Sequence, residues 1–189
     1  MKKAIVLFFI SQLFFAQQNN QLWKGYFSYN EIVDVEAASN SVFAATQNAV
    51  FSKATTSSDL KIFNSINGFK PESITTIHHS QSTNKTFAGN TNGLLLVINS
   101  DGSISSKVDI INEVPVPSNK KKINDFYEHD GKLYVATDYG ISVMDIATSE
   151  FIITYFVGTA GEETEVLQTT VLNNQIYAVT RSFGIRKGD

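Results

Sequence analysis

Short apolar strands recur along this chain at a nearly constant spacing. Each repeat contains an apolar strand with small residues near its end, then a turn, then a second apolar strand. The aromatic residue at the same position of each repeat is Phe43, Phe87, Tyr134 and Tyr177, which gives spacings of 44, 47 and 43 residues. A strand-rich repeat of about 40–50 residues predicts β-propeller blades, in which small antiparallel sheets stack face to face.

Alternation of apolar and polar residues extends each repeat to four expected strands, of which the last repeat shows three. We therefore expect an all-β fold: a β-propeller of which the chain holds about four partial or complete four-stranded blades. The expected first strands are 32–35, 74–77, 123–126 and 166–171, and the second strands are 42–46, 86–90, 133–137 and 176–180. Outer strands are expected at 60–63, 105–110 and 151–155.

Residues that tolerate positive φ mark the hairpin after the second strand. Gly93, Gly140 and Gly184 stand there in the last three repeats, because glycine adopts the left-handed conformation at little cost. The first repeat has Asn48 instead, and we expect Asn48 to take that conformation. Small residues such as Ala88-Gly89 recur just before this turn, which is typical of inner strands crowded toward a propeller axis. No repeat carries the Trp-Asp ending or Gly-His opening of WD40 blades.

Composition excludes several classes of protein. Hydrophobic residues make up 42% of the chain and charged residues 17%, a balance too apolar for intrinsic disorder. The net charge of -3 argues against a general nucleic-acid binder, which needs a clustered positive surface. Because the chain has no cysteine, it forms no disulfide and no thiolate metal site.

The N-terminus is typical of a secretory signal peptide. Met1-Lys2-Lys3 supplies a positive start, and an apolar stretch follows up to Ala16-Gln17. This stretch is short for a membrane span, which needs about 20 residues. We expect residues 1–16 to be a cleaved signal peptide and residues 17–189 to be the N-terminal portion of a propeller domain, a fragment of a longer protein. The aromatic segment 22–30 is expected to pack on the first blade or to close the last one.

Residues with catalytic or metal-binding potential are few. His78 and His79 are adjacent in a predicted strand, so their side chains point to opposite faces and do not converge on one ion. His129 lies beside a predicted hairpin turn. Asn99–Ser103 superficially resembles a calcium loop but lacks its terminal glutamate, and Asp101-Gly102 is typical of a hairpin turn.

Two charged clusters complete the candidates. Residues 162–165 include three glutamates without apolar neighbours that would bury them, which favours a solvated loop over acid–base chemistry. Residues 120–122 are three lysines that either bind an anionic ligand or protect the edge of the next strand. We therefore predict no catalytic, cofactor or metal residues and no cofactor, and the ligand-binding residues stay unknown.

Two resemblances to known families refine this interpretation. Residues 67–77, with 85–90 and 92–94, resemble the propeller repeat of two-component regulators, in the order of an Asn-Gly turn, a proline, an Ile-Thr strand and a second Gly turn. A resemblance over nearly all the mature chain is to the N-terminal propeller of the PorZ family. It is carried by Trp23 with residues 26–30, and by residues 121–127, 133–143 and 165–171.

The PorZ resemblance implies a non-catalytic component of the type IX secretion system of Bacteroidetes, exported to the outer surface of a Gram-negative cell. Its implied partners are a sortase-like protease, outer-membrane proteins of the system and anionic lipopolysaccharide, with no nucleic acid. Members of the family continue into further blades and a C-terminal secretion-signal domain. No site residue can be carried over, because the family's glycan contacts match no motif in this chain.

Two other functions stay open. The two-component-regulator repeat implies an extracytoplasmic sensor of oligosaccharides, for which a membrane helix and a kinase domain downstream would be the deciding features. An enzyme, such as a propeller lyase or glycosidase, would need paired acids or a base with an arginine at the mouth of the propeller, and the four repeats show no such set.

Overall fold

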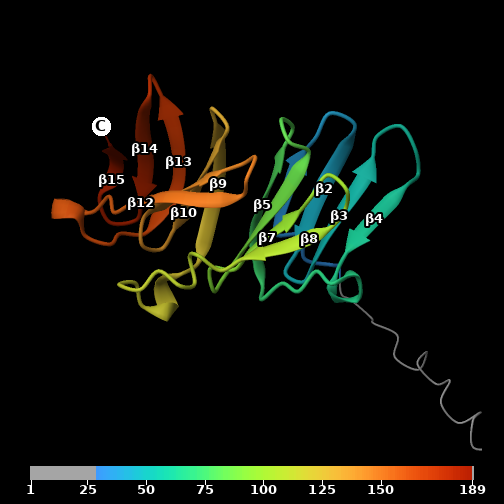
Figure 1. The fold of residues 1–189 in the computed structure, drawn as a ribbon, viewed down its shortest axis with the longest axis horizontal. Coiled ribbons are helices and arrows are strands. Elements are labelled where there is room, and N and C mark those ends of the chain that lie inside the picture. The colour runs from blue at the N-terminus through green and yellow to red at the C-terminus, as the bar shows by residue number, and fades with distance from the viewer. Residues whose placement is uncertain (1–28, 189) are drawn as a thin grey trace, which may run out of the picture.

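Four antiparallel sheets follow one another along the chain in the computed structural model, which describes residues 29–188 (Figure 1). Within each sheet the strands are neighbours in sequence order. The all-β propeller architecture is thereby confirmed. The strands are β1 (Asp34–Ala37), β2 (Ser41–Thr46), β3 (Ala49–Ala54) and β4 (Leu60–Phe63); β5 (Ile74–Ser80), β6 (Lys85–Asn90), β7 (Leu95–Ile98) and β8 (Ile104–Lys107); β9 (Ile123–His129), β10 (Lys132–Thr137), β11 (Ile141–Asp145) and β12 (Glu150–Tyr155); and β13 (Val166–Leu172), β14 (Gln175–Thr180) and β15 (Gly184–Lys187).

The blades meet through their first strands. β1 contacts β5, β5 contacts β9, and β9 contacts β13. In addition, β5, β9 and β13 each contact the second strand of the preceding blade. The outer strands β4, β8 and β12 lie at the ends of their sheets. Consequently β1, β5, β9 and β13 are the innermost strands, and β12 is a rim strand with one edge unpaired within residues 29–188.

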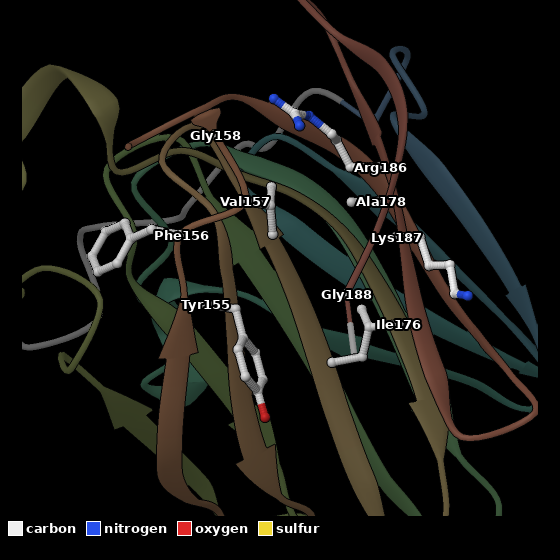
Figure 2. Close-up of a pocket in the computed structure, with 9 residues that line it drawn as sticks. All are labelled: Tyr155, Phe156, Val157, Gly158, Ile176, Ala178, Arg186, Lys187 and Gly188. Atoms are coloured by element: carbon white, nitrogen blue, oxygen red, sulfur yellow. The ribbon is translucent and has the colours of Figure 1, made fainter. Parts of the chain in front are cut away.

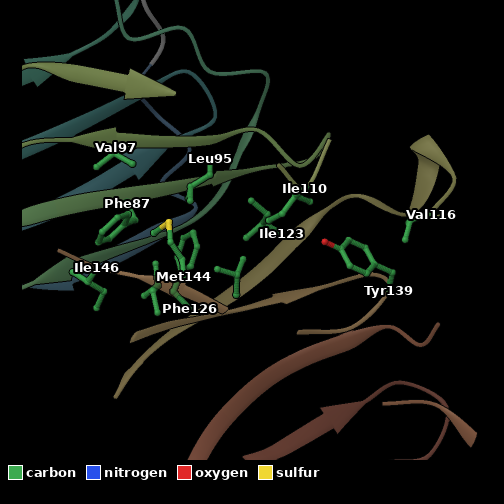
Figure 3. Close-up of a cluster of buried hydrophobic side chains, with 12 residues drawn as sticks. Phe87, Leu95, Val97, Ile110, Val116, Ile123, Phe126, Tyr139, Met144 and Ile146 are labelled. Carbon is green, nitrogen blue, oxygen red and sulfur yellow. The ribbon is translucent and has the colours of Figure 1, made fainter. Parts of the chain in front are cut away.

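Three buried clusters lie between successive blades. One joins blades 1 and 2 around Phe43 and Phe69, and another joins blades 3 and 4 around Tyr134 and Val166. The third, between blades 2 and 3, packs Phe87 against side chains from β9, β10 and β11 (Figure 3). Every aromatic residue that set the spacing in the first three repeats thus faces the next blade. In this packing each sheet buries both faces only when it has two neighbours.

The small residues before the turn lie on the second strand rather than on the innermost one, and their role differs from the expected crowding at the axis. A Cβ atom at Gly89 would lie 2.5 Å from Cγ2 of Ile123, the first residue of the innermost strand of the next blade. Ala45 and Ala136, at the same position of their repeats, are fully buried in the clusters toward the next blade. Small side chains are needed here to let the next blade approach.

A polar residue at the end of each second strand fixes the hairpin that follows. The hydroxyl groups of Thr137 and Thr180 donate to the carbonyls of Gly140 and Gly184, each at 2.9 Å. In blade 2 the side-chain amide of Asn90 donates to the carbonyl of Leu94 at 2.8 Å. These side chains are buried, so the turn is held from inside the sheet.

Three details of the strand prediction were wrong. The outer strand expected at 105–110 ends at Lys107, because the chain turns there and the N–H of Asn112 donates to the carbonyl of Val108. β1 begins at Asp34 instead of residue 32, although the backbone N–H of Val33 already donates to the carbonyl of Ala45. Asn48 does not adopt positive φ. The hydroxyl of Thr46 donates instead to Oδ1 of Asn48 at 3.0 Å, which holds this turn without the left-handed conformation.

The predicted signal peptide and most of the aromatic segment 22–30 lie outside the described residues. Tyr29, at the end of that segment, packs edge-on against Phe51 of β3, with ring centroids 4.7 Å apart. Among the described residues no helix has the length and apolarity that a membrane span requires.

Gly89→Ala should destabilise the protein by about 1–3 kcal/mol, because the added methyl group overpacks the contact with Ile123. Urea unfolding followed by intrinsic fluorescence measures this change. Combining Gly89→Ala with Ile123→Ala removes the nearest clashing atom, Cγ2 of Ile123, so the double variant should lose less stability than the sum of the single losses. Additive losses would show that the two residues do not limit how closely blades 2 and 3 approach.

Candidate functional site

A row of polar side chains links the innermost strands of blades 1, 2 and 3. His78 of β5 lies between two carboxylates: its Nδ1 is 3.2 Å from Oε1 of Glu36 on β1, and its Nε2 is 3.0 Å from Oε2 of Glu128 on β9. These three side chains are only partly exposed. One imidazole therefore bridges three blades, and we call Glu36, His78 and Glu128 the inter-blade bridge.

Asp34 extends this network at the start of β1. Its Oδ2 accepts hydrogen bonds from the hydroxyl of Thr76 and from the backbone N–H of Ile77, both at 2.8 Å. On the side of blade 3, the hydroxyl of Thr75 donates to the carbonyl of Ile123 at 2.6 Å. Each innermost strand is thus tied to the next by side-chain hydrogen bonds as well as by apolar packing.

The carboxylate of Glu128 has three side-chain hydrogen-bond partners. The hydroxyls of Ser80 and Ser82 donate to its Oε1 at 3.2 and 2.9 Å, while His78 contacts the other oxygen. Burial by itself raises the pKa of Glu128, but the hydrogen bonds from His78, Ser82 and Ser80 outweigh that effect and hold the pKa below its usual range.

Asp125 of β9 has the opposite electrostatic environment. Burial raises its pKa to about 6, a hydrogen bond from the backbone of Phe126 opposes that rise, and repulsion from Asp34 and Glu36 adds to it. A carboxyl with this pKa can exchange a proton near neutral pH. However, within residues 29–188 its side chain makes no hydrogen bond or ion pair with a base or a nucleophile.

The inter-blade bridge is poorly arranged for chemistry on a substrate. Both ring nitrogens of His78 are engaged by carboxylates, so neither is available to take a proton from a bound molecule. Among the described residues no group of three or more histidine, aspartate and glutamate side chains is placed to hold a metal ion. The geometry instead fixes the relative positions of three blades.

His79 points to the opposite face of β5, as strand alternation predicts. Its ring stacks on Phe43 with centroids 4.6 Å apart, and Nδ1 lies 2.9 Å from the hydroxyl of Thr86. Burial lowers the pKa of His79, and the nearby His78 lowers it further. His129 lies at the end of β9, stacked on Tyr127 at 6.4 Å. The three histidines therefore have three separate environments.

The three lysines at 120–122 do not form a free basic patch. Lys121 is buried, and its Nζ donates to the backbone carbonyls of Ile111 and Glu113. Burial lowers the pKa of Lys121, partly offset by the charge of Glu113. Lys120 pairs with Glu163 at 3.2 Å. Of the three, only Lys122 is exposed and forms no salt bridge within residues 29–188, so the cluster has mainly a structural role.

The other candidates from the sequence are also dispersed. Glu163 pairs with Lys120, and Glu165 forms a two-pronged pair with Arg181 at 2.6 and 2.8 Å. Glu162 is exposed. In the turn at Asn99–Ser103 the backbone N–H of Asn99 donates to the carbonyl of Ser103, and Gly102 has φ 84°. This segment is the β7–β8 hairpin, as predicted.

A cavity of about 270 Å³ lies between blades 3 and 4 (Figure 2). Residues that follow β12 form one wall, and Ile176 and Ala178 of β14 with Arg186 of β15 form the other. Nη2 of Arg186 donates to the hydroxyl of Thr159 at 2.9 Å, whereas its buried Nε has no partner within residues 29–188. The lining side chains that can donate hydrogen bonds belong to Arg186, Lys187 and Tyr155, and none of the lining residues is an acid.

The sequence did not single out Asp34, Glu36, Asp125 or Glu128. A usable signal was present, because polar residues occupy alternate positions of three first strands, at Asp34 and Glu36, at Thr76 and His78, and at Asp125. Placing them together requires knowing that first strands are innermost, which the spacing alone does not reveal.

Comparison with known proteins decides the family. The family described as the type IX secretion system PorZ N-terminal β-propeller domain matches residues 42–189, which is most of the chain. The chain belongs to the PorZ N-terminal propeller family. No curated protein matches the chain.

Solved structures agree on the fold. PorZ of Porphyromonas gingivalis, a surface component of its type IX secretion system, superposes with a TM-score of 0.72 at 18% identity, over 84% of this chain and 20% of that one. The extracellular domain of a hybrid two-component system of B. thetaiotaomicron gives 0.63 at 15% identity, over 85% and 20%. A computationally designed protein, Ika4, gives 0.63 at 15% identity, over 87% and 93%. This chain thus spans about a fifth of PorZ.

Asp125→Asn should stabilise the protein at neutral pH. Since the pKa of Asp125 is raised to about 6 in the folded state, the folded protein binds more protons than the unfolded chain between about pH 4 and 6. The stability of the wild type therefore decreases as pH rises from about 4 to 6. The variant has a neutral asparagine and does not lose this stability. We expect a gain of about 1 kcal/mol above pH 6.5, allowing for solvent screening, and little difference at pH 4.

Chemical denaturation of both proteins at several pH values measures this effect. Asp59→Asn, on an exposed aspartate outside the network, serves as the control and should show no such window. A stability difference between wild type and Asp125→Asn that does not change from pH 4 to pH 7 would contradict the raised pKa.

Proposed function

We propose that this chain is part of a non-catalytic surface component of a type IX secretion system. In this role it helps to deliver anionic lipopolysaccharide to the sortase complex that attaches secreted cargo. The observation that carries the proposal is the family match over residues 42–189. The similar PorZ is a bacterial surface component of that system, and the predicted signal peptide would export this chain to the same compartment.

The inter-blade bridge supports a structural rather than a catalytic role for these blades. Both ring nitrogens of His78 are paired with the carboxylates of Glu36 and Glu128. This arrangement holds the blades in fixed relative positions, which a scaffold requires, and leaves no reactive group on the imidazole. In this proposal the chain supplies a stable, non-reactive frame, and its partners contribute the chemistry.

The charge distribution limits where an anionic glycolipid binds. Asp34, Glu36 and Glu128 give the innermost strands of blades 1–3 an acidic character, and Lys120 and Lys121 are already engaged. Bulk attraction of an anion to these surfaces is therefore unfavourable. We expect lipopolysaccharide to be held by hydrogen bonds or aromatic stacking, or by parts of the protein beyond these blades.

An oligosaccharide sensor is the alternative. The superposition with extracellular domains of hybrid two-component systems of B. thetaiotaomicron, at TM-scores of 0.63, supports a shared blade architecture. That likeness concerns the fold alone, whereas the family match concerns the sequence over most of the chain. We therefore favour the secretion role.

Loss of this protein should leave type IX cargo unattached at the cell surface. Cell fractionation and immunoblotting of a cargo protein in a deletion strain, with the restored gene as control, measure attachment. Normal attachment, combined with a lost transcriptional response to a polysaccharide, would contradict the secretion role and favour the sensor.

Lipopolysaccharide binding should not depend on the lysine cluster. The double variant Lys120→Gln and Lys122→Gln leaves buried Lys121 in place, and we expect its affinity for purified lipopolysaccharide vesicles to stay within about twofold of wild type, the small effect usual for exposed charges. Co-sedimentation at two salt concentrations measures it. A large loss with a weaker salt dependence would identify a basic binding patch instead.

A further inference from the structure

The connection between blades 2 and 3 is a fixed loop on the rim of the propeller. Ile110 and Val116 anchor it in the core cluster shared by these blades. The Nζ atom of Lys121, which follows the loop in sequence, donates to the backbone carbonyls of Ile111 and Glu113. Backbone hydrogen bonds from Asn112 to Val108 and from Val116 to Glu113 close its turns. The segment between the anchors is therefore preorganised.

This loop holds apolar side chains in solvent. Val114 is 93% exposed, and Pro115 beside it is exposed as well. A flexible surface loop presents such residues only transiently, whereas this one presents them in a fixed place. Exposed apolar residues on a rigid support are typical of a protein contact.

Strand β12 forms the opposite wall. It is the last strand of its sheet, so the backbone groups along its outer edge have no strand partner within residues 29–188. Its register shifts between Phe151 and Ile153, which leaves Ile152 without a ladder partner and 57% exposed. A free edge with exposed apolar side chains is the usual template for strand addition.

Between loop and strand lies a cleft of about 590 Å³, which we call the rim cleft. Two of its lining residues, Asp109 and Glu113, are acidic, and none is basic. Neither carboxylate takes part in a hydrogen bond or ion pair within the described residues. The rim cleft thus combines a free strand edge, apolar walls and unpaired negative charge.

We propose that the rim cleft binds an extended segment of a partner protein in which basic and apolar residues alternate. The segment pairs with the free edge of β12 as an additional strand. Its lysine or arginine side chains lie on the face toward the loop, where their charged ends pair with Asp109 and Glu113 and their alkyl stems contact Val114. Its apolar side chains lie on the opposite face of the added strand. Main-chain hydrogen bonds supply affinity, and the alternating side chains supply specificity.

The charge pattern selects this occupant over an anionic one. A phosphorylated glycolipid or an acidic peptide would bring like charge to Asp109 and Glu113, which is unfavourable in a partly desolvated cleft. The surface is therefore separate from any lipopolysaccharide contact, and this inference stands independently of the proposed function.

A labelled peptide of alternating lysine and valine, about eight residues long to match a strand, tests the proposal by fluorescence anisotropy with the full-length protein. We expect saturable binding. The double variant Asp109→Lys and Glu113→Lys should weaken it by about tenfold or more, and should gain binding of the matching glutamate–valine peptide. Val114→Ser, at an exposed position that leaves the core intact, removes apolar contact without changing the charge and should also weaken binding of the lysine peptide.

The matched control is Glu31→Lys with Glu162→Lys, which changes the net charge equally at two exposed glutamates that do not line the rim cleft. Its affinity should equal that of wild type. Equal weakening in both double variants, or unchanged binding in the rim-cleft variant, overturns the proposal. A peptide N-methylated at alternate residues should bind poorly, and unaltered binding would overturn strand pairing with β12.

Discussion

Every blade of this protein depends on its neighbours to cover two apolar faces. Phe43, Phe87 and Tyr134 each leave their own sheet and pack into the next one, so the hydrophobic core consists of layers between blades rather than one centre. The blades must therefore approach closely for the protein to be stable. At Gly89 the space between two blades is too small for even one methyl group, which would clash with Ile123.

Polar groups on the innermost strands fix the relative orientation of the blades, which apolar packing alone does not determine. Apolar layers alone would allow a blade to slide or rotate slightly on its neighbour, because hydrophobic contact has little angular preference. Glu36, His78 and Glu128 require a single relative position of three strands, since charge-assisted hydrogen bonds lose strength quickly with geometry. Burial raises the pKa of Asp125 on the neighbouring innermost strand, and repulsion from Asp34 and Glu36 adds a smaller contribution.

Much of the fold was predictable because strand alternation and turn residues are local signals. The outer strand at 60–63 was placed to the residue, and Gly93, Gly140 and Gly184 adopt the positive φ expected of them. Contacts between blades were not predictable in this way. The pairing of His78 with Glu128 spans 50 residues, and the burial of Lys121 depends on how the loop after β8 folds over it. Both outcomes are set by tertiary packing, which residue types and spacing do not encode locally.

The side-chain bonds between innermost strands join residues of similar sequence separation throughout the chain. Asp34 reaches Thr76 across 42 residues, Thr75 reaches Ile123 across 48, and Asn124 reaches Val166 across 42. Closing a loop of nearly constant length costs nearly constant chain entropy, so each added blade meets about the same kinetic barrier as the one before it. The blades can therefore form in chain order, each finished sheet serving as the surface on which the next one forms.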